Sequence, residues 1–158
     1  MGFLLLLGRR APRVLARLMG YPPEAKASVC ADAVPDGQRY FGTGWYGEEA
    51  TTDGSIRWMR EHGAVLVPSA HGLGARVRIR AAPAITSDAE TETTMTLRVN
   101  DVFELPGIAM RPGFSDYEWS VPDAAWVSGT NELFFRVSRV ERRGTRTVGL
   151  ALASLHVE

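Results

Sequence analysis

The chain has 158 residues, of which 45% are hydrophobic and 23% charged, which fits one globular domain and excludes a disordered or collagen-like chain. Its 18 basic and 18 acidic residues give a formal net charge of zero, so the chain as a whole is not an electrostatic nucleic-acid binder. The single cysteine, Cys30, excludes an internal disulfide and a cysteine-based zinc site, and we expect neither a metal nor a cofactor.

The N-terminal segment differs in character from the rest of the chain. Residues 1–30 hold five basic residues and one acidic residue, whereas residues 31–158 hold 13 basic and 17 acidic ones. The run MGFLLLL at residues 1–7 is far shorter than the ~20 residues needed to cross a bilayer, and Arg9 and Arg10 follow it. It could be the end of a longer membrane helix that starts upstream, or an apolar cap on a surface helix.

Residues 11–19 predict a short amphipathic helix. Pro12 lies near its start, and Val14, Leu15 and Leu18 share one face, while Arg13 and Arg17 lie on another. Such a helix, within a segment of residues 1–20, could bind a membrane surface or a membrane protein, or it could pack on its own domain. Residues 21–37 read as a linker, in which Cys30 has no expected role, and residues 38–158 as the folded domain.

From residue 38 onward the hydrophobic pattern has a period of two, which predicts strands. The clearest segment is residues 76–81, RVRIRA, in which three arginines alternate with Val77, Ile79 and Ala81. About nine short strands are expected in this part of the chain, near residues 39–46, 55–60, 64–68, 76–81, 94–99, 102–105, 117–121, 132–137 and 147–157. Many short strands separated by turn signals predict an all-β fold, a sandwich or a barrel.

Three motifs resemble the galactose-binding-domain-like jelly-roll sandwiches, which recur as carbohydrate-binding and accessory modules. They are LRVNDV at residues 97–102, YEWSVP at residues 117–122 and GTNELFF at residues 129–135. Asp101 stands where glycine is more usual in the first turn. GWYGE at residues 44–48, with Arg57 and Trp58, is similar to modules found next to bacterial membrane glycosyltransferases and sulfatase-like proteins.

This resemblance covers residues 40–158 and implies an antiparallel jelly-roll β-sandwich after a short N-terminal helix. It also implies an accessory function on cell-envelope glycans. We expect Asn100, Gly129 and Asn131 to serve the turns of the sandwich, because asparagine and glycine tolerate a left-handed backbone.

The expected ligand site is an aromatic and charged cluster, because a sugar needs a flat apolar ring and planar polar groups. Its residues are Trp45, Tyr46, Glu48, Arg57 and Trp58, with Glu49 beside them. The alternative is that both tryptophans belong to the core and that Glu48 and Arg57 form a structural ion pair.

Two further clusters have the same two interpretations. Tyr117, Trp119 and Trp126 could be core residues or a stacking platform. The other cluster is an arginine stripe formed by Arg76, Arg78 and Arg80, with Arg98 on a neighbouring strand. It could bind an anionic polymer, or its arginines could pair across strands with residues such as Glu92 and Glu132.

No convincing catalytic pattern is present in the sequence, so we expect no enzyme. Ser69, His71 and Asp53 lack a nucleophile elbow, and the neighbours Glu48 and Glu49 should point to opposite faces of a strand. The family resemblance and the cluster around Trp45 and Trp58 together imply non-catalytic carbohydrate binding. The alternative is a structural or protein-interaction domain that docks through residues 1–20.

A membrane-associated or extracytoplasmic location is favoured over a free cytoplasmic one, but the side of the membrane stays open. The arginines after the apolar run favour the cytoplasmic side, whereas the family resemblance favours the outside.

Overall fold

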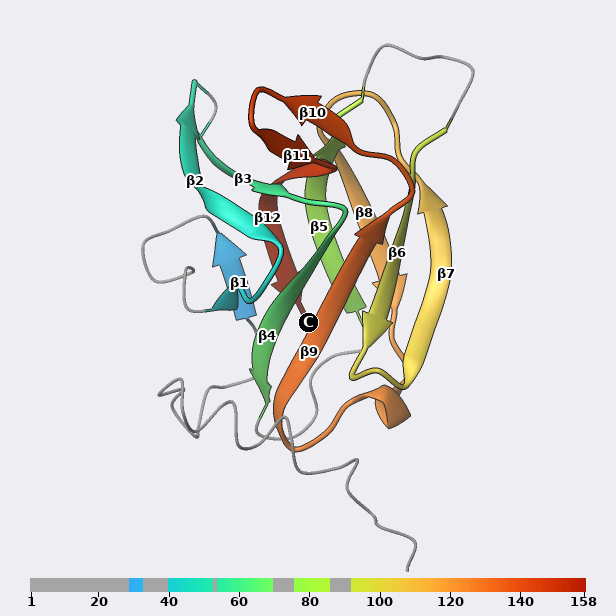
Figure 1. Cartoon of the computed structure of the whole chain (residues 1–158). Helices are drawn as coiled ribbons and strands as arrows, with labels where there is room; N and C mark the ends of the chain where they lie inside the picture. The colour runs from blue at the N-terminus through green and yellow to red at the C-terminus, as the bar shows by residue number, and fades with distance from the viewer. Residues whose placement is uncertain (1–28, 33–39, 53, 70–75, 86–91) are drawn as a thin grey trace, which may run out of the picture.

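The computed structural model describes residues 29–32, 40–52, 54–69, 76–85 and 92–158 (Figure 1). The predicted N-terminal helix, and the predicted linker apart from residues 29–32, lie outside this part of the chain. So do His71 and Asp53, two of the three residues weighed as a catalytic triad.

Two antiparallel sheets form the domain, as predicted. The six-stranded sheet has the order β2–β3–β12–β5–β8, and β1 pairs with the C-terminal half of β12. Its strands are β1 (Val29–Asp32), β2 (Trp45–Thr51), β3 (Gly54–Met59), β5 (Arg76–Pro83), β8 (Ser115–Ser120) and β12 (Leu150–Val157). The four-stranded sheet has the order β4–β9–β6–β7 and contains β4 (His62–Ser69), β6 (Thr94–Val99), β7 (Phe103–Ala109) and β9 (Gly129–Val137).

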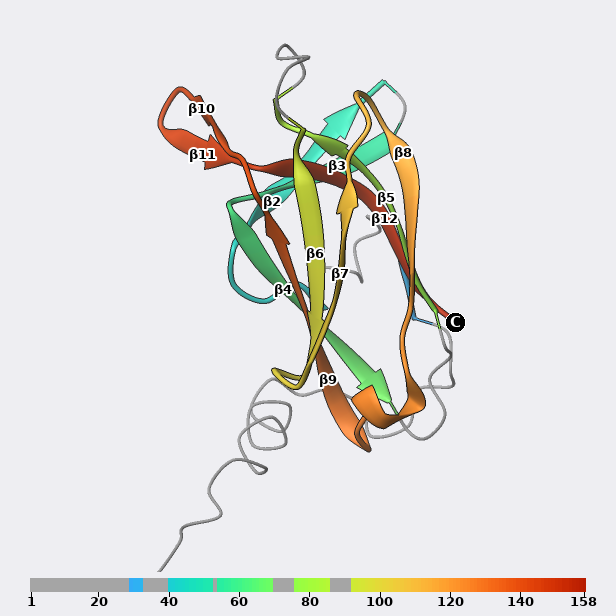
Figure 2. The ribbon, with the colours of Figure 1, turned by 90° about the vertical axis from the view of Figure 1, so that its right-hand side faces the viewer.

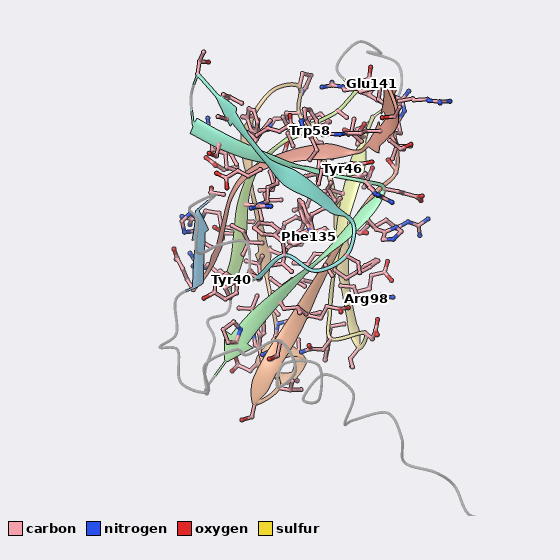
Figure 3. The ribbon with its side chains drawn as sticks, turned by 60° about the vertical axis from the view of Figure 1, so that its left-hand side comes forward. Tyr40, Tyr46, Trp58, Arg98, Phe135 and Glu141 are labelled. Carbon is pink, nitrogen blue, oxygen red and sulfur yellow. The ribbon has the colours of Figure 1, made fainter. Side chains whose placement is uncertain are left out.

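The two sheets pack face to face; in Figure 2 the strands β4, β6 and β9 of the four-stranded sheet lie to the left of β5 and β8 of the six-stranded sheet. One face of each strand supplies the core, because successive side chains point to opposite sides. In β5, Val77, Ile79 and Ala81 are buried while the three arginines between and beside them are exposed, as predicted. Phe135 of β9 is the largest fully buried side chain and lies between the sheets (Figure 3).

A separate hairpin of β10 (Glu141–Arg143) and β11 (Arg146–Val148) pairs with neither sheet. The sequence predicted one strand over residues 147–157, but Gly149 divides this stretch into β11 and β12. The Gly149 amide donates to the carbonyl of Met59 at 2.7 Å and its carbonyl accepts from Ala84 at 2.8 Å, so contact with β3 and β5 begins at Gly149, whereas β11 before it pairs with β10.

Strand boundaries differ from the prediction at two further places. β2 covers residues 45–51, whereas the prediction placed this strand at residues 39–46. Residues 42–44 bond instead to the backbone of β4 and of Arg60. The predicted linker contains β1, whose four residues pair with β12 from Val29–Val157 to Asp32–Ser154.

The β6–β7 turn is tied to the loop before β9 by two asparagines. Asn100 and Asp101 have φ values of 53° and 59°, so both adopt the left-handed backbone of a tight hairpin turn, and Asp101 occupies it without glycine. Asn100 Nδ2 donates to Asn131 Oδ1 at 2.7 Å and to the carbonyl of Ala125 at 2.8 Å. Asn131 lies in the extended strand β9 and not in the left-handed region, but it serves the turn as expected, since its amide group bonds both the N–H and the C=O of Val127.

Candidate functional site

The predicted cluster of five residues lies on the β2–β3 hairpin but does not form one surface. Arg57 and Met59 point from β3 towards the core side, whereas Trp58 points outward from the six-stranded sheet. Trp45 packs against the core, and Trp58 lies on the other side of the hairpin. Trp45 and Trp58 are therefore not a coplanar pair of stacking rings.

Trp45 has a structural position. Its Nε1 donates to the carbonyl of Ala64 at 2.9 Å, and its ring meets Phe41 edge to face with centroids 5.0 Å apart. A Cβ on Gly63 would lie 2.7 Å from this ring, so the glycine allows the indole to lie against the backbone of β4. Trp45 thus closes one end of the core.

Arg57 and Glu48 form the ion pair that the structural alternative predicted. They are opposite one another in the β2–β3 register, with Arg57 Nη2 and Glu48 Oε2 3.5 Å apart. Arg57 is only 4% exposed, and its guanidinium lies 4.7 Å from the centroid of the Phe41 ring. A guanidinium in this position is held by contacts within the fold.

Tyr46 and Trp58 attach the β10–β11 hairpin to the sheet (Figure 3). The Tyr46 hydroxyl donates to the carbonyl of Thr147 at 3.1 Å and accepts from its N–H at 3.3 Å. Trp58 Nε1 donates to Glu49 at 3.2 Å, and the guanidinium of Arg143 covers the ring at 4.5 Å. Glu49 also forms an ion pair with Arg146. Ligand binding by the five predicted residues stays a prediction, and Trp58 is the outward-facing ring among them.

The second predicted cluster belongs to the core. Tyr117 and Trp119 are each 4% exposed, and Trp119 Nε1 donates to the carbonyl of Pro106 at 3.2 Å. The Tyr117 hydroxyl accepts from the N–H of Arg111 at 2.9 Å. Trp126 packs against the same core from the loop before β9. These rings are positioned to stabilise the sandwich.

The arginine stripe is exposed and paired across the sheet, although not with the partners expected. Arg76 and Arg78 both lie near Glu118 of β8, and Arg80 lies near Asp116. The hydrogen bond to Glu118, 3.0 Å from Arg78 Nη2, raises the pKa of Arg78. Arg98 belongs to the other sheet and is not part of this stripe. These pairings favour the structural interpretation of the stripe.

A different surface brings an aromatic ring and polar groups together, on the outer face of the four-stranded sheet. Phe134 is half-buried there, since Leu133 and Phe135 beside it point inward. The ring of His62 stacks on Phe134 with centroids 5.4 Å apart and planes 24° apart. The guanidinium of Arg98 lies 4.6 Å from the Phe134 centroid. We call this surface, formed by His62, Arg98, Phe134 and Arg136, the Phe134 face.

A pocket of about 330 Å³ adjoins the Phe134 face. Arg136 links the two, because it lies two residues after Phe134 on the same side of β9. Its guanidinium is 3.5 Å from Glu61. The other polar residues that line the pocket are Thr94, Thr96, Glu104 and Ser138. Hydroxyl, carboxylate and guanidinium groups thus open into one space beside an aromatic ring.

Acidic residues surround Arg98 on this sheet. Arg98 Nη2 is 2.7 Å from Asp101, and Glu104 is its direct partner in the β6–β7 register. Burial raises the pKa of Glu132 on the neighbouring strand; the Asp101 carboxylate raises it further, while Arg98 opposes both effects.

The sequence held one signal for this surface that its interpretation did not use. In residues 132–137 the outward positions carry Glu132, Phe134 and Arg136, so a large aromatic ring interrupts the polar face of the strand. His62 gave no such signal, because only the pairing of β4 with β9 brings it to Phe134. Within the described ranges, no group of three or more histidine, cysteine or acidic side chains could hold a metal ion.

Known proteins resemble this chain in fold only. No family model and no curated protein sequence matches it. Among solved structures, the Cry4Aa toxin of Bacillus thuringiensis matches with a TM-score of 0.49 and 18% identity, over 82% of this chain and 23% of the toxin. An exo-beta-1,3-galactanase of Phanerochaete chrysosporium, solved with galactose, matches with a TM-score of 0.45 and 14% identity, over 85% and 30% of the two chains.

A family 29 carbohydrate-binding module matches with a TM-score of 0.41 and 13% identity, over 75% of this chain and 81% of the module. Carbohydrate-binding modules and β-sandwich parts of glycoside hydrolases are thus among the structures that this chain is similar to, as its motifs indicated. The chain spans about a quarter of the toxin and less than a third of the galactanase. At these identities no ligand or activity is transferred, and a function has to be argued from the side chains.

Proposed function

We propose that this chain is a carbohydrate-binding β-sandwich that holds a glycan on the Phe134 face and in the pocket beside it. The observation that carries this proposal is the half-buried Phe134 ring, which lies next to a pocket lined by hydroxyl, carboxylate and guanidinium groups. Sugar rings pack their apolar C–H faces on aromatic surfaces, and their hydroxyls need planar polar partners. Phe134 and Arg136 supply these two groups two residues apart on β9; because His62 and Arg98 already lie against the Phe134 ring, a sugar would pack on the part of the ring that they leave exposed.

The proposal includes binding without catalysis, on glycans of the cell envelope. Glu61, one of the two carboxylates in the pocket, forms an ion pair with Arg136. The envelope setting comes from the sequence resemblance alone. Among the described residues, no helix is long and apolar enough to cross a membrane.

A glycan array probed with the full chain tests this proposal. Phe134→Ala should weaken binding roughly tenfold, because the variant loses ring stacking worth ~0.5–1.5 kcal/mol and the apolar contact area as well. Phe134→Leu keeps most of the apolar volume, so its affinity should lie between those of the wild type and of Phe134→Ala. Circular dichroism and thermal unfolding show whether each variant is folded.

Two matched variants locate the site. Trp58→Ala removes the outward ring of the cluster predicted from sequence, and Arg78→Ala removes an exposed arginine from the opposite outer face. We expect both to bind like the wild type. Loss of binding in Trp58→Ala alone would place the site on the β2–β3 hairpin, and release of sugar from the array ligand would contradict a non-catalytic function.

The alternative is a structural or protein-interaction domain without a small ligand. The internal contacts of Trp45, Tyr46 and Arg57 favour it, because three of the expected ligand-binding residues already serve the fold. A folded chain that binds no glycan on the array would support this alternative over our proposal.

A further inference from the structure

Each end of the sandwich exposes two large apolar side chains. Four large apolar residues are exposed in the part of the chain that the structure describes: Val102, Phe114, Val127 and Val140. Val102, at 74% exposure, follows the β6–β7 turn, and Val127, at 46%, lies in the loop before β9. The β6–β7 turn and the loop before β9 both lie at the lower end in Figure 1, and the asparagine bonds join them.

Phe114 and Val140 lie at the opposite end. Phe114 precedes β8, whose other end leads into the loop that contains Val127. Val140 follows β9, which begins directly after that same loop. They therefore provide matched controls for the surface formed by Val102 and Val127.

The end that carries Val102 and Val127 is acidic. The segments 99–107 and 121–132 contain no lysine or arginine, and their acidic residues are Asp101, Glu104, Asp123 and Glu132. Asp101 is engaged by Arg98, so the other three carboxylates leave an excess of negative charge around the two valines. We call this surface, formed by Val102, Glu104, Asp123 and Val127, the acidic end.

Residues 1–20 of the same chain have the complementary chemistry. They contain four arginines and no acidic residue, and their remaining side chains are largely apolar. The sequence predicts a helix over residues 11–19 with Val14, Leu15 and Leu18 on one face. Such a helix offers apolar side chains to two valines and guanidinium groups to the carboxylates around them.

The chain geometry allows this contact. Val29, where the described part begins, pairs with Val157, which pairs with Val77, which pairs with Trp119. At about 4.8 Å between strands, Val29 lies roughly 14 Å from Trp119, shortly before the loop of the acidic end. Residues 21–28 can span up to ~26–29 Å, so residues 1–20 can reach the acidic end.

We propose that residues 1–20 dock on the acidic end of their own sandwich, with the apolar face of helix 11–19 against Val102 and Val127. This inference goes beyond glycan binding, since Val102, Asp123 and Val127 do not line the pocket and Glu104 alone belongs to both surfaces. Docking of the arginines against Glu104 and Asp123 compensates the opposite charges of the two parts of the chain.

Hydrogen exchange of the full chain, followed by mass spectrometry, tests the docking. Amides of residues 11–19 should exchange at least about tenfold more slowly in the full chain than in the free peptide 1–20. The double variant Val102→Glu with Val127→Glu should raise their exchange to the rate of the free peptide. The control, Phe114→Glu with Val140→Glu, should leave their exchange unchanged.

Reversal of the charges on both surfaces gives a second test by the same measurement. Arg13→Glu with Arg17→Glu should speed exchange in residues 11–19, and adding Glu104→Lys with Asp123→Lys should slow it again. Three results would overturn the proposal: wild-type residues 11–19 that exchange like the free peptide, slowing that grows with protein concentration and so reports a second copy, or slowing that appears only with phosphatidylglycerol vesicles.

Discussion

At the scale of single residues, the fully buried side chain of Asn131 forms three hydrogen bonds that join β9 to two other segments. It accepts from the Val127 N–H and from Asn100, and it donates to the Val127 carbonyl. Its solvent exposure is 0%. If alanine replaced Asn131, the Val127 and Asn100 groups would lose these bonds inside the protein, where an unsatisfied polar group costs ~1–3 kcal/mol.

Asn131→Ala should therefore lower the free energy of unfolding by about 2–4 kcal/mol, measured by urea denaturation. Each kcal/mol should lower the melting temperature by roughly 2–4 °C in a domain of this size. Ser120→Ala, an exposed change at a strand end, is the control and should stay within about 0.5 kcal/mol of the wild type. A loss below about 1 kcal/mol for Asn131→Ala would show that the bonds do not fix the loop.

Glu132 makes the stability of the domain depend on pH in a defined direction. Its pKa is raised in the folded state above its ordinary 4.5, first by burial and then by Asp101. The folded protein therefore binds more protons than the unfolded chain between these two pKa values, and this contribution to stability falls as pH rises through that window. Glu132→Gln removes this loss.

The free energy of unfolding of Glu132→Gln, relative to the wild type, should thus increase as the pH rises above 4.5. Asp101→Asn removes the second cause of the shift and should make the pH dependence of the wild-type glutamate smaller. Urea denaturation at several pH values measures both. A relative stability that decreases over this range would contradict the raised pKa.

At the scale of elements, side chains hold the β10–β11 hairpin, since it pairs with no other strand. Tyr46 supplies two of these contacts through its hydroxyl, Arg143 covers Trp58, and Arg143 Nη2 also donates to the carbonyl of Ala84 at 2.9 Å. A hairpin held in this way can open without unfolding either sheet.

Tyr46→Phe should therefore speed hydrogen exchange in residues 141–148 while lowering global stability by less than about 1.5 kcal/mol, because only two hydrogen bonds are removed. Tyr117→Phe is the matched control, since its hydroxyl bonds Arg111 in another loop. Equal effects of both variants on the hairpin would contradict a local role for Tyr46.

The strands that could be predicted from sequence are those with one buried and one exposed face. In β5 and β6 the polar and apolar residues alternate strictly, and both strands appear at the predicted place. β1 could not be predicted, because four residues in a segment with linker composition form a strand only through their pairing with β12. The division between β11 and β12 depends on the distant carbonyl of Met59.

At the scale of the whole molecule, the fold class was predictable and the candidate site was not. Alternation and turn residues depend on local sequence, and they indicated an all-β sandwich or barrel; the family resemblance added the antiparallel sandwich, which the two sheets confirm. The composition of the β2–β3 cluster could not show that Trp45 faces the core while Trp58 faces outward. The strand predicted over residues 39–46 differs from β2, which begins at Trp45, so the side that Trp45 faces could not be derived from it. The Phe134 face depends on register between β4, β9 and β6, which no single segment encodes.

The last strand of the four-stranded sheet also bears on how copies of this protein behave beside one another. β7 forms the edge, its register with β6 shifts between Met95 and Leu97, and it contains Pro106, which has no N–H to donate. A flat edge with a full row of donors is a template for polymerisation between chains. The irregular edge strand β7 lacks such a regular row of donors, so fibrils should not grow from this edge in concentrated solutions of the folded protein.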